Sequence, residues 1–252
     1  MPGDERPLLE WQVENLRLTV LLKGDQTEPP VEEWWRHVAG KDPEEENRRP
    51  QEGLVILTGR FESGILSLEY QPLRIDIRLQ CHPEQSPQSG GFSVLGSFES
   101  MSDAFVGSAG KILELDSLPP TYRVAYGVVI LYPVSDRAAG YRQLQAYLPT
   151  VEIDAENSSD FLYRVNRRRQ LGPELEDLTV NRLSNWSVAV RRSVMACEAS
   201  VKTVDIGTAC RLELDINTST ERRTPLPQEH ITEIVGRLVE MSKEIARNGD
   251  IK

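Results

Sequence analysis

Polar and apolar residues alternate over several short stretches of the chain, as they do in strands that bury one face. The clearest stretch is Leu73–Gln80, where Leu73, Ile75, Ile77 and Leu79 share one side and polar residues the other. Similar strand-like stretches cover residues 8–23, 53–61, 64–70, 150–154, 161–166, 178–183, 186–194 and 209–217. Because the clearest stretch carries charges on its polar side, we expect a sheet that is covered on one face only.

Two other segments have apolar residues at the three- and four-residue spacing of an amphipathic helix. Pro30 begins the first, in which Val31, Trp34, Trp35 and Val38 form the apolar stripe. A short helix buries only one stripe, so we expect one tryptophan to be buried and the other to be partly exposed. The second segment closes the chain and has its stripe at Ile231, Ile234, Val235, Leu238, Val239 and Ile245. This stripe predicts a long helix that packs on the sheet.

The remaining segments complete the predicted fold. Tyr122–Tyr132 is apolar at nearly every position, which is typical of a strand buried on both faces. Residues 102–107 and 135–147 are candidate helices, the second capped by Ser135, and the polar residues 41–52 are expected to form a loop. Together these elements predict an α+β fold with mainly antiparallel sheet in meanders. We expect residues 1–252 to form one compact chain, with two possible halves, 1–81 and 92–252, separated by a loop at 82–91.

The overall composition narrows the class of protein. Of the 252 residues, 39% are hydrophobic, which is enough to bury a core. The formal net charge of −10 disfavours sequence-independent binding to nucleic acid. No stretch has the length and apolarity of a membrane span, and Met1–Glu10 lacks the pattern of a signal peptide. Cys81, Cys197 and Cys210 form no CxxC pair. We expect a cytoplasmic protein that makes no membrane contact.

The common motifs of catalytic and cofactor sites are incomplete in this sequence. Gly107–Lys111 resembles the end of a phosphate-binding loop but lacks the first glycine and the final serine or threonine. Cys81 and His82 are neighbours at the end of a strand, where adjacent side chains point to opposite faces and do not meet as a nucleophile and its base. Three acids at alternating positions are expected to form a solvated face: Glu152, Asp154 and Glu156. We therefore predict no catalytic residue, no metal site and no cofactor; an enzyme with a site assembled from scattered residues stays an alternative.

One stretch of this acidic chain is basic. Residues 161–200 contain seven Arg and four acids, with aromatic residues interleaved. Arg forms bidentate contacts with carboxylates and phosphates, which makes this stretch the candidate binding region. The candidate residues are Arg164, Arg167, Arg168, Arg169, Arg182, Trp186, Arg191 and Arg192. Three uses are open: docking of an acidic partner, binding of single-stranded nucleic acid or a phosphorylated ligand, and pairing with acids of the same chain.

Three fragments of the second half can be compared with known families: Asp160–Arg168, Val180–Ser187 and Leu214–Thr218. They resemble a sporadically distributed family of uncharacterised bacterial proteins of about this length. The resemblance implies an α+β bacterial protein with no known activity, and it transfers no catalytic residue.

These observations favour a non-catalytic macromolecule-binding protein, such as an accessory, immunity or antitoxin-like subunit of a bacterial complex, whose partner is another protein. The alternative is a sensor domain that binds a phosphorylated ligand or single-stranded nucleic acid through the Arg-rich residues. Docking of a partner predicts that Arg167–Arg169 are exposed and lie near Arg182, Arg191 or Arg192 on one face.

Overall fold

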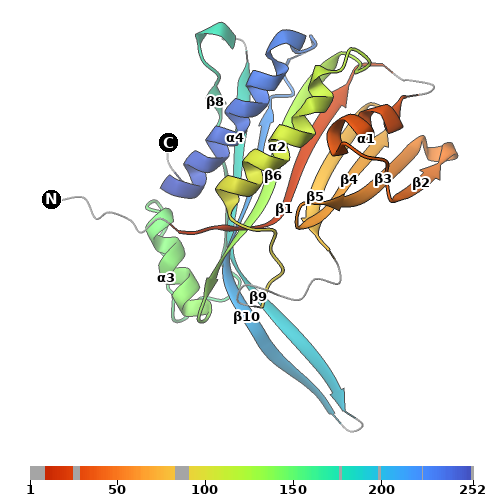
Figure 1. Cartoon of the computed structure of the whole chain (residues 1–252). Coiled ribbons are helices and arrows are strands. Elements are labelled where there is room, and N and C mark those ends of the chain that lie inside the picture. Colours follow the sequence, from red (N-terminus) through yellow and green to blue (C-terminus); the bar gives the residue numbers. More distant parts are fainter. Residues whose placement is uncertain are drawn as a thin grey trace.

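One antiparallel sheet organises the molecule. The computed structural model describes residues 9–24, 29–82, 91–175, 178–197, 200–222 and 224–250. In these ranges ten strands pair in the order β2-β3-β4-β5-β1-β6-β10-β9-β7, with β8 also paired to β9 (Figure 1). The strands are β1 (Gln12–Leu22), β2 (Glu45–Arg49), β3 (Leu54–Phe61), β4 (Gly64–Gln71), β5 (Arg74–Cys81), β6 (Thr121–Val134), β7 (Leu162–Asn166), β8 (Arg169–Gln170), β9 (Thr179–Cys197) and β10 (Ser200–Thr218). The predicted α+β class with antiparallel meanders is confirmed.

The first strand lies in the middle of the sheet and joins its two sides. β1 pairs with β5 on one edge and with β6 on the other. Strands from before and after the predicted boundary loop therefore belong to the same sheet. Residues 83–90 of that loop lie outside the described residues.

The helices cover one face of the sheet, while on the opposite, more open face Phe92 and Val94 pack on Leu131 and Ala209. In the described ranges the helices are α1 (Val31–Ala39), α2 (Phe98–Ala109), α3 (Arg137–Tyr147) and α4 (Ile231–Asn248). Figure 1 shows α1, α2 and α4 in front of the sheet. The third helix, α3, is on the same side, because its Gly140 carbonyl contacts the thiol of Cys210, which shares a side of β10 with the buried Leu212. The predicted packing of a long C-terminal helix on the sheet is confirmed.

Successive side chains of β5 point to opposite faces of the sheet. Ile75, Ile77 and Leu79 are fully buried under the helices, as predicted, while Arg74 and Arg78 lie on the open face. The prediction is wrong for Leu73, which is 45% exposed. Leu73 stands in the turn before β5 with φ of 70°, so it does not continue the alternation of the strand.

Both tryptophans of α1 are buried, so the prediction that one would be partly exposed is wrong. α1 contacts β3 and β4 of the sheet and also α2 beside it, and it therefore buries more than one stripe. Trp34 packs against Tyr70 of β4, with ring centroids 5.9 Å apart. Trp35 lies over Gly59 of β3, where a Cβ atom would stand 3.0 Å from the indole ring.

Three other segments differ from their sequence-based predictions. Glu45–Arg49, expected in a loop, forms β2 by backbone pairing with β3, although all five side chains are exposed. Residues 150–154, expected as a strand, are not in a strand, and the chain turns at Asp154. The N-cap of α3 is Asp136 and not Ser135, since the Asp136 carboxylate accepts from the Ala139 amide.

Candidate functional site

The Arg run that follows β7 is held by acids that come much later in the chain. Arg167 donates to Asp250 through Nε and Nη2, at 2.9 and 2.8 Å. Arg168 pairs with Glu221, and Arg169 makes two hydrogen bonds to Glu244 of α4. Each Arg of this run thus has a carboxylate partner in its own chain, which is the arrangement expected from the intramolecular alternative.

The carboxylate of Asp250 is the most enclosed member of this group. Its side chain is 1% exposed, and it also accepts a hydrogen bond from the Tyr163 hydroxyl at 2.7 Å. The hydrogen bonds from Arg167 hold the pKa of Asp250 below its ordinary value, against the effect of burial. The pKa of Glu244 is lowered in the same way by Arg169. We call Arg167, Arg169, Glu244 and Asp250 the C-terminal clasp, because they join β7 and β8 to the end of α4.

Two further candidate residues lie inside the molecule. Trp186 is fully buried and packs on Tyr147 and Trp11, so its ring offers no stacking surface to a ligand. Arg182 is 2% exposed and its Nη2 is 3.5 Å from Glu244. Burial lowers the pKa of Arg182, and the nearby Arg169 acts in the same direction.

Arg191 and Arg192 lie far along β9 from the clasp. Arg191 stands nine positions after Arg182 on the strand, a distance of about 30 Å. Arg191 donates to the Gly91 carbonyl, and Arg192 pairs with Asp205 on β10 at 3.0 Å. The predicted grouping with the Arg run therefore fails for these two residues.

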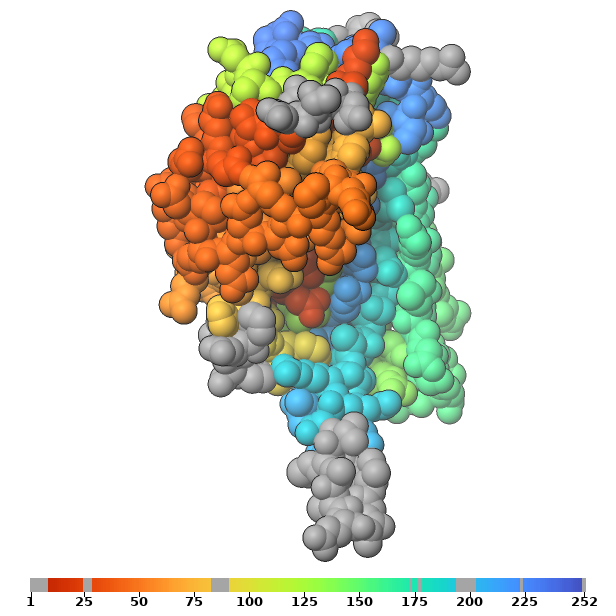
Figure 2. Space-filling model, turned by 90° about the vertical axis from the view of Figure 1, so that its right-hand side faces the viewer, coloured from red at the N-terminus to blue at the C-terminus, as the bar shows by residue number. Residues whose placement is uncertain are grey.

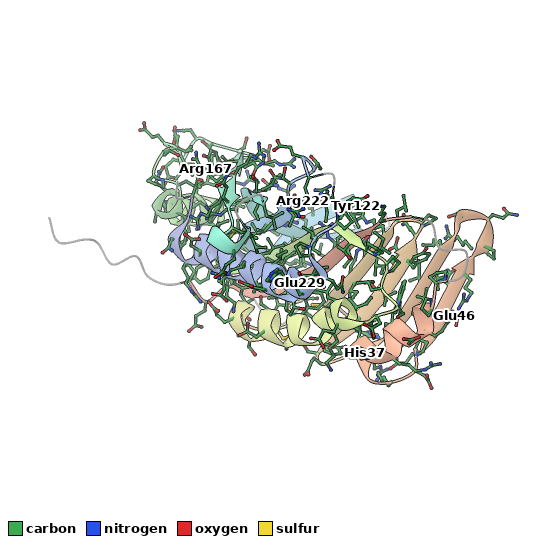
Figure 3. The ribbon with its side chains drawn as sticks, turned by 90° about the horizontal axis from the view of Figure 1, so that it is seen from above. His37, Glu46, Tyr122, Arg167, Arg222 and Glu229 are labelled. Atoms are coloured by element: carbon green, nitrogen blue, oxygen red, sulfur yellow. The ribbon has the colours of Figure 1, made fainter. Side chains whose placement is uncertain are left out.

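Arg164 is the one candidate that stays available to a partner. It is exposed, and within the described ranges its side chain makes no hydrogen bond or ion pair. It stands on β7, the last strand in the order of the sheet. Figure 3 shows Arg167, just beyond β7, and Glu46 of β2 at opposite ends of the molecule, so β7 and β2 are the two margins of the sheet.

The outer edge of β7 presents backbone groups that no strand satisfies in the described ranges. The Arg167 amide donates to the Arg182 carbonyl on β9, which fixes the direction of backbone groups along β7. The amide and carbonyl groups of alternate residues therefore point away from β9, and these same residues have exposed side chains: Leu162, Arg164 and Asn166. Leu162 is 62% exposed, more than the other large apolar side chains that stand exposed in the described ranges, Leu73 and Ile206.

The opposite margin of the sheet has a different character. All five residues of β2 are exposed, and four of them are charged. Arg48 contacts Glu46 and Glu32, and Arg49 lies 3.6 Å from Glu52. Charged residues on an edge strand discourage pairing with another chain. The margin at β7 carries a single charged residue, Arg164, and is less protected in this way; we call it the β7 edge.

Two of the thiols and the three alternating acids noted in the sequence lie in the described ranges. Burial raises the pKa of the Cys81 thiol to about 11 and that of the buried Cys210 thiol to about 12, so both are protonated at neutral pH. No group of three or more His, Cys, Asp or Glu residues in the described part of the chain is placed to hold a metal ion. The three alternating acids are dispersed around a turn, where Asp154 accepts from Asn157 and Glu156 pairs with Arg142.

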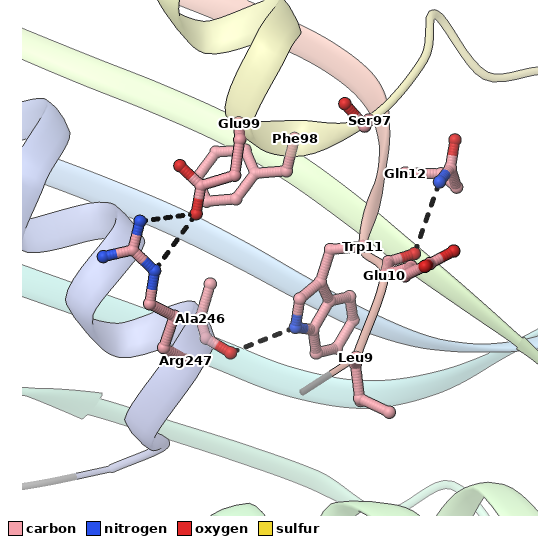
Figure 4. Close-up of a pocket in the computed structure, with 9 residues that line it drawn as sticks. All are labelled: Leu9, Glu10, Trp11, Gln12, Ser97, Phe98, Glu99, Ala246 and Arg247. Atoms are coloured by element: carbon pink, nitrogen blue, oxygen red, sulfur yellow. Dashed lines mark hydrogen bonds and ion pairs between the residues drawn. The ribbon is translucent and has the colours of Figure 1, made fainter. Parts of the chain in front are cut away.

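A cavity of about 440 Å³ lies beside Trp11 (Figure 4). Leu9, Phe98 and the Trp11 ring form its apolar wall. The Trp11 indole N–H donates to the Ala246 carbonyl at 3.1 Å. Across the cavity, Arg247 pairs with Glu99 at 2.6 Å. These polar groups satisfy one another, so the cavity offers a ligand mainly apolar contact.

No protein-family model matches the chain, and no curated protein matches it either. The resemblance of its second half to an uncharacterised bacterial family therefore stays a prediction. In the described ranges, no helix has the length and apolarity needed to cross a membrane.

Sequence reasoning identified Arg164 by its charge but missed its neighbour Leu162 as a surface residue. The alternation of residues 161–166 was a usable signal, because it places Leu162, Arg164 and Asn166 on one side of a strand. The sequence carries no signal that this strand is the last of the sheet. That position depends on pairing with β9, about twenty residues later.

Proposed function

We propose that the protein is a non-catalytic macromolecule-binding protein that adds an extended segment of a partner protein to the β7 edge. The observation that carries the proposal is the outward row of unpaired backbone groups beside an exposed Leu162 and an unpaired Arg164. In strand addition, main-chain hydrogen bonds supply affinity, and side chains at alternate positions supply selectivity. Strand addition is one kind of contact through which an accessory, immunity or antitoxin-like subunit can hold its partner.

The side chains of the β7 edge define the partner segment. Among the described residues no acid pairs with Arg164, so an aspartate or glutamate across from it gains a charge-assisted hydrogen bond. Leu162 stands two residues away on the same side and favours an apolar neighbour. The partner segment is therefore an extended strand in which an acidic and an apolar residue share one side.

The alternative of a sensor that holds a phosphorylated ligand or single-stranded nucleic acid has less support. The guanidinium groups of Arg167–Arg169 already donate to carboxylates, and a phosphate would have to displace these acids. The overall charge of −10 also opposes a polyanion.

Reversal of the charge at Arg164 tests the proposed function. The probes are two short labelled peptides of alternating residues, one of valine and glutamate and one of valine and lysine. We expect the wild-type protein to bind the glutamate peptide at least about tenfold more tightly in fluorescence anisotropy, and Arg164→Glu to reverse this preference. Arg60→Glu is the matched control, since Arg60 is a highly exposed residue of β3, near the opposite margin of the sheet.

Two further measurements separate backbone pairing from simple charge attraction. N-methylation of the glutamate peptide at alternate amides removes its donors, and we expect it to abolish binding. Arg164→Pro removes an outward amide at an edge position, where proline is tolerated in a sheet, and should also abolish binding. Equal affinity for the glutamate and lysine peptides, or full binding of the methylated peptide, would contradict strand addition at the β7 edge.

A further inference from the structure

The open face of the sheet has a hollow of about 330 Å³ near its centre. β5, β1, β6 and β10 run side by side beneath it, and its floor is Gly127, which has no side chain to fill the space. Figure 2 shows atoms of β1, in dark red, at the bottom of a recess between the orange strands β3 and β4 and the blue end of β10. Polar side chains surround this floor: Asn15, Arg17, Arg78, Gln80, Glu213 and Asp215.

Two arginines stand directly opposite each other on one side of the hollow. Arg17 of β1 and Arg78 of β5 are cross-strand partners, an arrangement of like charges that is unfavourable in a sheet. The positive charge of Arg78 is compensated by ion pairs with Glu69 at 2.8 Å and with Asp76 at 3.2 Å. The positive charge of Arg17 is compensated less well, because its nearest carboxylate, on Asp215, is 3.5 Å away.

The Arg17 side chain has unused hydrogen-bonding capacity inside the hollow. Its guanidinium lies over Gly127, where a Cβ atom would stand 3.3 Å from Nη2. Its Nε atom is buried and has no hydrogen-bond partner. A buried donor without an acceptor costs free energy, and an added acceptor recovers it. Because Nε has no exposed surface, a ligand carboxylate reaches it only when the Arg17 side chain, which is 34% exposed, turns toward the hollow; the carboxylate then supplies the missing acceptor.

The β10 side of the hollow carries the opposite charge. Glu213 and Asp215 stand there at alternate positions of the strand. Asp215 is held in place by the Asn217 amide at 2.9 Å, and Asn217 in turn accepts from Arg123 and Asn181. Because this network orders Asp215 before any ligand arrives, little conformational entropy is lost on binding.

We propose that the hollow binds a small zwitterion of the class of free amino acids and short peptides. The ligand carboxylate lies at Arg17 and Arg78, and its ammonium group lies at Asp215 and Glu213. Two cations and two anions line the hollow, so a ligand with one charge of each sign matches both sides. A phosphate or a simple carboxylate meets repulsion from the β10 acids, and a simple amine meets repulsion from the arginines.

Three matched probes test this proposal by calorimetric titration at constant ionic strength: glycylglycine, N-acetylglycylglycine without the ammonium group, and glycylglycine amide without the carboxylate. We expect glycylglycine to bind at least about tenfold more tightly than either blocked form. Arg17→Gln should weaken glycylglycine binding by about tenfold or more. Gly127→Ala should also weaken it, because the new methyl group enters the hollow and crowds Arg17 while every charge is kept.

Controls separate this site from the β7 edge. Arg164→Glu should leave glycylglycine binding unchanged, and Arg17→Gln should leave the peptide preference of the β7 edge unchanged. Thermal melts of each variant verify that the fold is intact. The proposal is overturned if glycylglycine gives no binding, if either blocked form binds as tightly, or if folded Arg17→Gln keeps the wild-type affinity.

Discussion

Replacement of Leu238 with alanine is expected to lower the free energy of unfolding by about 2–5 kcal/mol, the cost of truncating a large side chain in a packed core. Leu238 is fully buried at the middle of α4. The helix contacts β6, β9 and β10, so the cavity left by the missing atoms lies between the helix and the sheet. The surrounding strands are tied by their own pairing and cannot collapse to fill it.

Urea denaturation followed by circular dichroism measures this change. Leu238→Met, which nearly keeps the side-chain volume, should cost less than about 1.5 kcal/mol. Arg237→Ala, at the neighbouring exposed position, should leave the midpoint close to that of the wild type. An unchanged midpoint for Leu238→Ala would mean that α4 does not stabilise the sheet.

The elements that the sequence predicts well are those whose signal is local. Ile75, Ile77 and Leu79 alternate within a few residues, and the stripe of α4 repeats within each turn of the helix, so their burial follows from short windows. Glu45–Arg49 shows the limit of this method. Five polar residues with no apolar alternation form a strand because the neighbouring β3 supplies hydrogen-bond partners for their backbone. Tertiary pairing there overrides the local preference.

The same limit explains why the sequence did not reveal which candidate Arg residues pair with acids of the same chain. Their charge is evident in the sequence, but the acids that pair with Arg167 and Arg169 come 83 and 75 residues later. Arg164 points away from these acids, because it lies on the other face of β7 from Tyr163, which contacts Asp250, and β7 is at the margin of the sheet. Both properties depend on strand order, which no local window contains. The pairing of Arg17 with Arg78 across 61 residues was hidden for the same reason.

Removal of the Asp250 carboxylate is expected to produce a pH-dependent loss of stability. Gly249, at φ of 79°, turns the chain after α4 so that the Asp250 amide reaches the Tyr147 carbonyl and the carboxylate meets Arg167. The neutral amide of Asp250→Asn keeps the shape but loses the charge opposite Arg167. We expect a cost of about 2–3 kcal/mol at pH 7, below that of a fully buried pair because Arg167 is partly exposed.

The sign of the pH dependence follows from the lowered pKa of Asp250. In the unfolded chain the pKa of an aspartate is about 3.9, its ordinary value. A group whose pKa is lower in the folded state stabilises the protein above the unfolded pKa, and this contribution is lost as the pH falls through the folded pKa. The difference in unfolding free energy between wild type and Asp250→Asn should therefore be largest near neutral pH and should shrink below about pH 4.

Urea denaturation of both proteins between pH 7 and the acid limit of the folded state measures this difference. Glu244→Gln should show the same trend, since the pKa of Glu244 is also lowered, by Arg169. Asp42→Asn is the matched control, because Asp42 and its ion-pair partner Arg36 both have highly exposed side chains. Loss of such an exposed pair should leave the urea midpoint unchanged at every pH. A difference for Asp250→Asn that stays constant or grows on acidification would show that the clasp does not depend on the charge of this carboxylate.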